Sequence, residues 1–132
     1  MLNTKQDQNT NDQNAKRKFD LEDRTMLFAK AVNAFIKAIP KDITTFENSK
    51  QLVRSAGSVA ANYIEANEAL SKKDFIMRIK ICRKEAKESR LWLSLIQPPA
   101  EDTQTRERLL DEATQLMKIF GAILAKTGNT KF

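Results

Sequence analysis

The sequence contains no histidine, which removes the side chain most often used for general-base catalysis and for binding zinc. Its single cysteine, Cys82, rules out an intramolecular disulfide and fits a reducing compartment. Without a histidine to activate it, this thiol is also a weak candidate nucleophile. The sequence has no glycine-rich phosphate-binding loop. These absences predict that the protein is not an enzyme and has no metal site and no cofactor.

Glycine and proline are scarce, at three residues each, and no apolar run approaches the roughly 18 residues of a membrane span. The N-terminus lacks the apolar segment of a secretory signal peptide. We therefore expect a cytoplasmic protein with no membrane partner. With 132 residues, a net charge of +6 and an isoelectric point near 9.6, the chain is expected to form one basic domain with a tail.

The residues that are abundant are helix formers, chiefly Ala, Leu, Lys, Glu, Ile and Arg. Residues 1–19 are polar and rich in Asn and Gln, so a disordered tail is predicted there, with a second short tail at 128–132. Between them, residues 20–127 contain four amphipathic segments, at 21–39, from 44 onward, at 72–97 and at 103–126. Their similar lengths and short links predict an all-α fold, an antiparallel up-down-up-down four-helix bundle.

Polar residues mark the expected starts of these helices, and proline or glycine marks their ends. The expected caps are Asp20, a capping box that begins at Thr44, Ser71 and Asp102, and the expected ends lie at Pro40, Pro98 and Gly128.

Each helix has an apolar face at three- and four-residue spacing, which predicts its core-facing residues. In chain order these are Phe28, Ala31, Val32, Phe35 and Ile39; Phe46, Val53, Ala56, Ala60 and Ile64; Phe75, Ile79, Cys82, Ala86, Leu93 and Ile96; and Leu109, Ala113, Leu116, Phe120 and Ile123. Leu110, Met117 and Leu124 widen the last of these faces.

A tract of small residues at 55–61 contains Gly57, which costs about 1 kcal/mol relative to alanine inside a helix. Close approach of a neighbouring helix is the expected reason, with approach of a ligand as the alternative. After this tract, Asn62, Glu65 and Glu68 are expected to form a hydrogen-bond network that ties this helix to the next. A functional site there is the other interpretation.

The helix predicted at 72–97 carries most of the charge. Segment 72–90 holds eight basic and three acidic residues, a balance of +5. A row of cations along one helix face can follow a phosphate backbone. The alternative is a solvated face balanced by pairs such as Lys84 with Glu88. On the first interpretation, the nucleic-acid-binding residues are Lys73, Lys80, Arg83, Lys84, Lys87 and Arg90.

The same helix has a second apolar ridge away from its core-facing line, formed by Met77, Ile81, Trp92 and Leu95. Two apolar ridges on one helix indicate two packing partners, the core of the bundle and another subunit. We therefore expect a homo-oligomer with this ridge at its interface.

Several short motifs in this region resemble a known family. They are Ser58-Val59-Ala60-Ala61-Asn62 with Glu65, then Ser71-Lys72-Lys73-Asp74-Phe75, Lys84-Glu85-Ala86 and Trp92-Leu93. Over residues 20–127 the chain resembles the four-helix-bundle proteins encoded in 23S rRNA intervening sequences. It departs from them at Ala66, where many members carry glycine.

This resemblance implies a left-handed antiparallel bundle that assembles as a ring, with five subunits as the expected number. The chain also looks related to accessory proteins of diversity-generating retroelements, which are basic pentameric barrels that bind nucleic acid and a reverse transcriptase. No catalytic residues come with the resemblance.

Two functions remain open at this point. The first is a non-enzymatic oligomeric accessory protein that binds RNA or DNA through the basic face of the helix at 72–97. The alternative is a scaffold ring that binds another protein, for example a reverse transcriptase, without intrinsic affinity for nucleic acid. A role at a membrane surface ranks third, because exposed aromatic residues do not flank the basic face.

Overall fold

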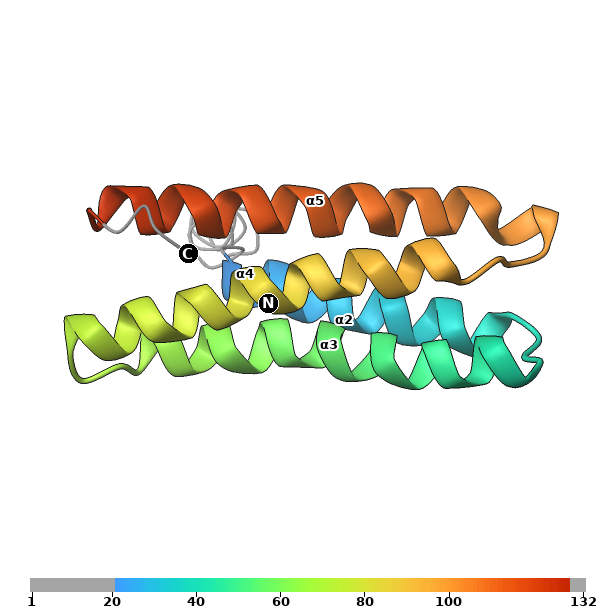
Figure 1. Ribbon diagram of the computed structural model, residues 1–132, viewed down its shortest axis with the longest axis horizontal. Helices are drawn as coiled ribbons and strands as arrows, with labels where there is room; N and C mark the ends of the chain where they lie inside the picture. Colours follow the sequence, from blue (N-terminus) through green and yellow to red (C-terminus); the bar gives the residue numbers. More distant parts are fainter. Residues whose placement is uncertain (1–20, 129–132) are drawn as a thin grey trace, which may run out of the picture.

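The computed structural model describes residues 21–128 as four long helices and one short turn of 3-10 helix. These are α2 (Leu21–Ala38), α3 (Ile43–Asn67), α4 (Lys72–Leu95), η1 (Ala100–Asp102) and α5 (Thr103–Lys126). The helices run alternately up and down and form an antiparallel four-helix bundle (Figure 1), as predicted. The predictions for the two tails and for Asp20 as a cap lie outside the described residues.

Helices that follow one another along the chain pack side by side, and α5 closes the bundle by returning to α2. α3 lies against both α2 and α4, and α4 lies against α5 (Figure 1). The contact between α2 and α5 is reinforced by a two-pronged ion pair, in which Arg24 donates to Glu112 at 2.7 and 2.8 Å. Within residues 21–128, none of the helices combines the length and apolar composition that a membrane-spanning segment needs.

The start of α3 differs from the prediction. The helix begins at Ile43, and its cap is Asp42, whose carboxylate accepts a 2.8 Å hydrogen bond from the Thr45 backbone N–H. This bond lowers the pKa of Asp42. The predicted capping box at Thr44 is therefore wrong, because an aspartate two residues earlier is an equally good cap.

The other helix ends follow the prediction more closely. Ser71 caps α4 by accepting a 3.0 Å hydrogen bond from the Asp74 backbone N–H. Asp102 occupies the cap position of α5, but its side chain makes no capping hydrogen bond. α5 ends in front of Gly128, whose φ of +81° is the left-handed conformation that glycine favours after a helix.

The hydrophobic core confirms most of the predicted inward positions on α2, α4 and α5. On α4, only Phe75 is partly rather than fully buried, and on α5 Ile123 is partly buried while Leu124 is fully buried. On α2, Ala31 is exposed, so its predicted inward position is wrong.

On α3 the predicted inward face is wrong except at Ala56. Phe46, Val53 and Ile64 are 49%, 40% and 47% exposed, and Ala60 is only partly buried. The buried residues of α3 are Ser49, Leu52, Ser55, Ala56, Val59 and Ala66, and four of these six are serine or alanine. Small residues at this position allow the backbones of α3 and α4 to approach closely.

Two contacts show this close approach. The hydroxyl groups of Ser55 and Ser89 lie 2.8 Å apart in the buried interface, and the Cys82 thiol donates to the backbone carbonyl of Val59 at 3.6 Å.

Gly57, however, lies away from this interface: a Cβ atom added to it has no atom within 4 Å. The expectation that another helix of the same chain packs closely on Gly57 is therefore wrong.

Candidate nucleic-acid interface

Four lysines, Lys73, Lys80, Lys84 and Lys87, lie on one side of α4 and are named here the lysine row. Their spacing of seven, four and three residues keeps all four within about 40° of Lys80 around the helix axis. Lys80 is partly buried and the other three are exposed. Within residues 21–128, none of the four forms an ion pair with a carboxylate.

The acidic residues of α4 lie on the flank next to the lysine row, toward α3. Glu85 is only 6% exposed and accepts hydrogen bonds from the Arg54 guanidinium at 3.3 and 3.5 Å. Arg54 also contacts Glu88 at 3.2 Å. The predicted pair of Lys84 with Glu88 is therefore wrong, because Glu88 takes its cation from α3.

A second polar contact joins the same two helices nearer the start of α4. Arg78 donates to the Asn62 side-chain oxygen at 3.0 Å and lies 4.0 Å from Asp74. The predicted network between the end of α3 and α4 is thus confirmed at Asn62. Glu65 and Glu68 are exposed, and their side chains take no part in it.

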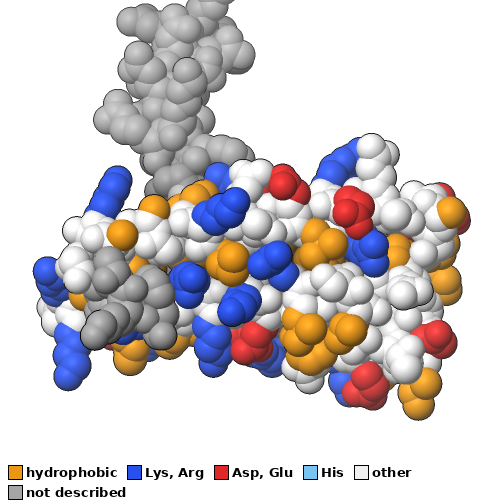
Figure 2. All heavy atoms as spheres, turned by 45° about the horizontal axis from the view of Figure 1, so that its top comes forward, with side chains coloured by type: hydrophobic (Ala, Val, Ile, Leu, Met, Phe, Trp, Pro, Cys, Tyr) orange, Lys and Arg blue, Asp and Glu red, His pale blue; other side chains and the backbone are white. Residues whose placement is uncertain are grey.

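The charges of α4 are therefore separated between two flanks. Its carboxylates are paired with arginines on the side that faces α3, and its lysines face solvent without carboxylate partners in the described part of the chain. Figure 2 shows Lys and Arg side chains gathered on the face formed by α4 and α5, with few acidic side chains among them. This face can attract an anion along its length.

The two arginines predicted to bind nucleic acid, Arg83 and Arg90, lie on the flank of α4 that faces α5. Arg90 Nη1 is 3.9 Å from the Met117 sulfur, and Arg83 Nε is 3.5 Å from the position of a Cβ built on Gly121. Both arginines are partly buried. The structure therefore places them beside the lysine row, where α4 packs against α5.

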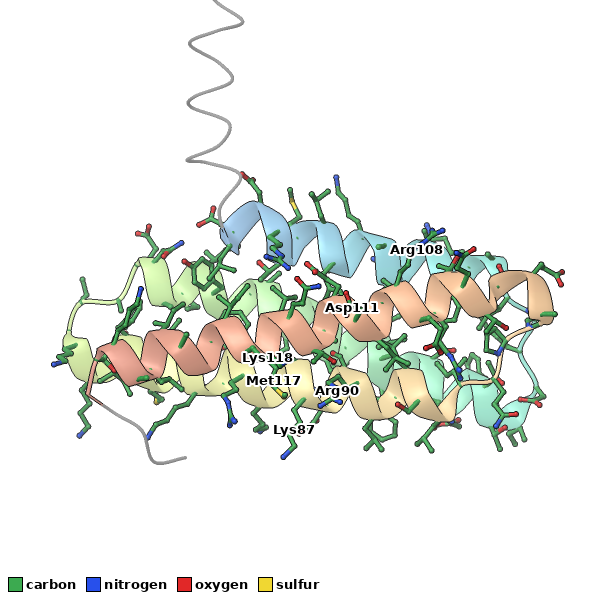
Figure 3. The ribbon with its side chains drawn as sticks, turned by 90° about the horizontal axis from the view of Figure 1, so that it is seen from above. Lys87, Arg90, Arg108, Asp111, Met117 and Lys118 are labelled. Carbon is green, nitrogen blue, oxygen red and sulfur yellow. The ribbon has the colours of Figure 1, made fainter. Side chains whose placement is uncertain are left out.

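Lys118 of α5 joins this group, although the sequence analysis did not include it. Figure 3 shows Lys118 and Met117 beside Arg90 and Lys87 at the middle of the bundle. Lys118 is exposed and directly follows Met117, which packs against the core. The periodicity of α5 predicts this exposure, but its position beside α4 depends on the packing of the two helices.

The predicted oligomer ridge is divided between two environments. Met77 and Leu95 are 47% and 50% exposed, whereas Ile81 and Trp92 are partly buried. Trp92 packs against the core of its own chain, with its indole N–H buried. Leu91, at 49% exposed, adds an apolar position that the sequence analysis missed.

A further set of apolar side chains is exposed on α3. It consists of Ile43, Phe46, Val53 and Ile64, and Ile43 is the most exposed of them at 79%. Phe46 is covered in part by Lys50, whose ammonium group lies 5.3 Å from the ring centroid.

Cys82 and the acidic residues are the side chains of the described chain to consider for chemistry. Cys82 is buried, and burial raises the pKa of its thiol to about 12, so it is not a reactive thiolate at neutral pH. Within residues 21–128, no cluster of three or more His, Cys, Asp or Glu residues is placed to hold a metal ion.

Comparisons with known proteins agree with this architecture. The chain is similar to a solved structure described as a protein with unknown function from the S23 ribosomal protein family of Bacteroides thetaiotaomicron. The two are 29% identical, the alignment covers 79% of this chain and 97% of that chain, and the TM-score is 0.64. A comparison with curated proteins gave no match. Residues 17–122 match the family described as 23S rRNA-intervening sequence protein, and the chain therefore belongs to this family.

Proposed function

We propose that this protein is a non-enzymatic, homo-oligomeric accessory protein of the cytoplasm that binds RNA or DNA through the basic face of α4. The observation that carries the proposal is the lysine row, which has no carboxylate partner in the described chain. The acidic residues of the same helix are engaged elsewhere, so they do not neutralise the row. Arg83 and Arg90 add positive charge beside it.

The physical basis of this binding is release of counterions. Each lysine that neutralises a phosphate releases condensed cations, so the affinity falls steeply as salt increases. If about five phosphates are engaged, the logarithm of the binding constant falls with a slope of about −4 against the logarithm of salt concentration. The row from Lys73 to Lys87 extends about 21 Å along the helix, long enough to contact several phosphates.

The test is binding of a structured RNA and of a DNA duplex to the full chain, measured at low and high salt. Replacing Lys80, Lys84 and Lys87 with glutamate is expected to weaken binding at least a hundredfold, because three attractive charges become repulsive. The matched control replaces Lys30, Lys37 and Arg108, all exposed and on other faces, with glutamate. Binding that is insensitive to salt, or equally weakened in both triple variants, contradicts the proposal.

The oligomeric part of the proposal is supported by exposed apolar side chains on α3 and α4. Met77, Leu91 and Leu95 are each about half exposed, as are Phe46 and Ile64 on α3. Burying such side chains against another subunit is favourable at roughly 25 cal/mol per Å² of apolar surface. Light scattering after size exclusion is expected to give about 75 kDa, five times the 15.1 kDa chain. A 15.1 kDa monomer contradicts this part of the proposal.

The second candidate is a ring that binds another protein, such as a reverse transcriptase, without affinity of its own for nucleic acid. The exposed apolar residues of α3 favour it, because a protein partner can cover them as well as a second copy can. It predicts a stable complex that persists at high salt. Replacing Val53 and Ile64 with serine is then expected to abolish the complex, while replacing the lysine row leaves it intact.

A further inference from the structure

Where α4 packs against α5, the surface line between the two helices is named here the α4–α5 groove. It carries a cation, Arg90, that forms no ion pair with a carboxylate of the described chain. Arg90 is partly buried there, and the neighbour that it meets across the groove is the Met117 sulfur at 3.9 Å, a weak acceptor. Its Nε is buried and makes no hydrogen bond within residues 21–128. A partly desolvated guanidinium is costly without a counter-charge, so a bound anion stabilises this arrangement.

Two lysines from different helices flank Arg90. Lys87 comes from α4 and Lys118 from α5, both are exposed, and Figure 3 shows them near Arg90 and Met117. Neither pairs with a carboxylate in the described chain. The carboxylate of Asp111, two turns before Lys118 on α5, accepts a 2.7 Å hydrogen bond from Gln115 and forms no ion pair within residues 21–128. Arg90, Lys87 and Lys118 therefore lie near one another, and none of them is paired with a carboxylate of the described chain.

We propose that Arg90, Lys87 and Lys118 form a phosphate-binding site in this groove, and that it holds a phosphodiester group of the nucleic-acid backbone. The site rests on the proposed function and extends it, because it places the backbone across α4 and α5 instead of along α4 alone. Arginine offers several N–H donors in a fixed planar arrangement that matches the oxygens of a phosphate. The two lysines supply additional charge from either side.

The arginine and lysine roles differ, and this difference makes the site testable. Arg90→Lys keeps the charge but removes the planar donor arrangement, so it is expected to weaken binding about tenfold while the salt slope stays unchanged. Lys118→Gln removes one phosphate contact, so it is expected to weaken binding severalfold and to reduce the salt slope by about 0.9 for duplex DNA. Arg108→Gln is the matched control, because Arg108 is an exposed cation of α5 that lies away from the groove (Figure 3).

The experiment is fluorescence anisotropy of a labelled DNA duplex with the full chain, at several salt concentrations, after circular dichroism has shown that each variant is folded. Lys118 is exposed, so its variant tests the site even if the Arg90 variant does not fold. If Lys118→Gln binds no differently from Arg108→Gln, or a folded Arg90→Lys binds like the unmodified chain, the groove site is wrong. The proposed function then still stands if lysine-row variants weaken binding. If the unmodified chain binds neither RNA nor DNA, both proposals fail.

Discussion

The two flanks of α4 use similar charged residues in opposite ways. On the flank that faces α3, Glu85 and Glu88 share Arg54 across the helix interface. On the solvent and α5 side, Lys84 and Lys87 have no carboxylate partner in the described chain. The comparison teaches that the net charge of a helix does not identify its binding surface. The flank on which the opposite charges are already paired stabilises the fold, and the flank without such pairs remains available to a partner.

The largest effect on stability is expected when Arg54, the cation that pairs with Glu85 and Glu88 on the flank facing α3, is removed. Arg54→Gln leaves Glu85, which is only 6% exposed, as a buried carboxylate without its partner. We expect a loss of about 2 kcal/mol of unfolding free energy, below the usual range for a buried pair because Arg54 itself is half exposed. Urea denaturation measures it. The control is Lys50→Gln, whose exposed pair with Glu47 is worth little, and an equal effect of the two variants contradicts the assignment.

A second test measures how stability depends on pH through Cys82, which lies in the interface between α3 and α4. Burial raises the pKa of Cys82 to about 12 in the folded chain, above its ordinary value of 9.0. The stability that this thiol contributes is therefore complete below pH 9.0 and is lost progressively as the pH rises toward 12. At pH 10 we expect the difference in unfolding free energy between the unmodified chain and Cys82→Ala to shrink by about 1.4 kcal/mol relative to pH 8. A difference that does not change with pH shows that Cys82 ionises as readily in the folded chain as in the unfolded one.

A substitution on the outer surface of α3 is expected to change the unfolding free energy somewhat less. Gly57→Ala is expected to stabilise the isolated bundle by about 1 kcal/mol, because the added methyl group meets no atom within 4 Å. Gly121→Ala is the matched substitution on α5, where the nearest atom is Arg83 Nε at 3.5 Å. Thermal unfolding compares the two. If Gly57→Ala alone lowers stability or the mass measured by light scattering, another subunit packs closely on α3 at this position.

The smallest effects are expected on the lysine row itself. Lys84→Gln and Lys87→Gln each remove an exposed cation that has no ion-pair partner in the described chain. We expect the unfolding free energy to change by no more than about 0.5 kcal/mol in either case. A loss above about 1 kcal/mol in urea denaturation shows that these lysines support the fold, which removes the contrast between the two flanks.

The fold could be predicted from the sequence because capping residues, proline and glycine mark the helix ends, and most helices have strong apolar periodicity. The core-facing line of α4 was predictable because Ile79, Cys82, Ala86 and Leu93 recur at three-, four- and seven-residue spacing. The face of α3 was not, because large apolar residues occur on both sides of this helix. Leu52 and Val59 are buried, whereas Phe46, Val53 and Ile64 are exposed.

The candidate site was predictable only in part, because some of its contacts join different helices. The spacing of Lys80, Lys84 and Lys87 within one helix is enough to align them. The partner of Glu88 and the position of Lys118 depend on which helices become neighbours and in what register. Local periodicity carries no information about contacts between helices, so the pairing of Glu88 with Arg54 and the contact of Arg90 with Met117 emerged only from the packed structure.

The most direct test of the account is the salt dependence of DNA binding in two triple variants that lose equal charge. One replaces Lys80, Lys84 and Lys87 with glutamine, and the other replaces Lys30, Lys37 and Arg108 with glutamine. We expect the first to reduce the slope of log affinity against log salt by about 2 to 3, and the second to leave it nearly unchanged. Equal slopes in the two variants, or a reduced slope only in the second, would contradict the claim that the unpaired flank of α4 binds nucleic acid.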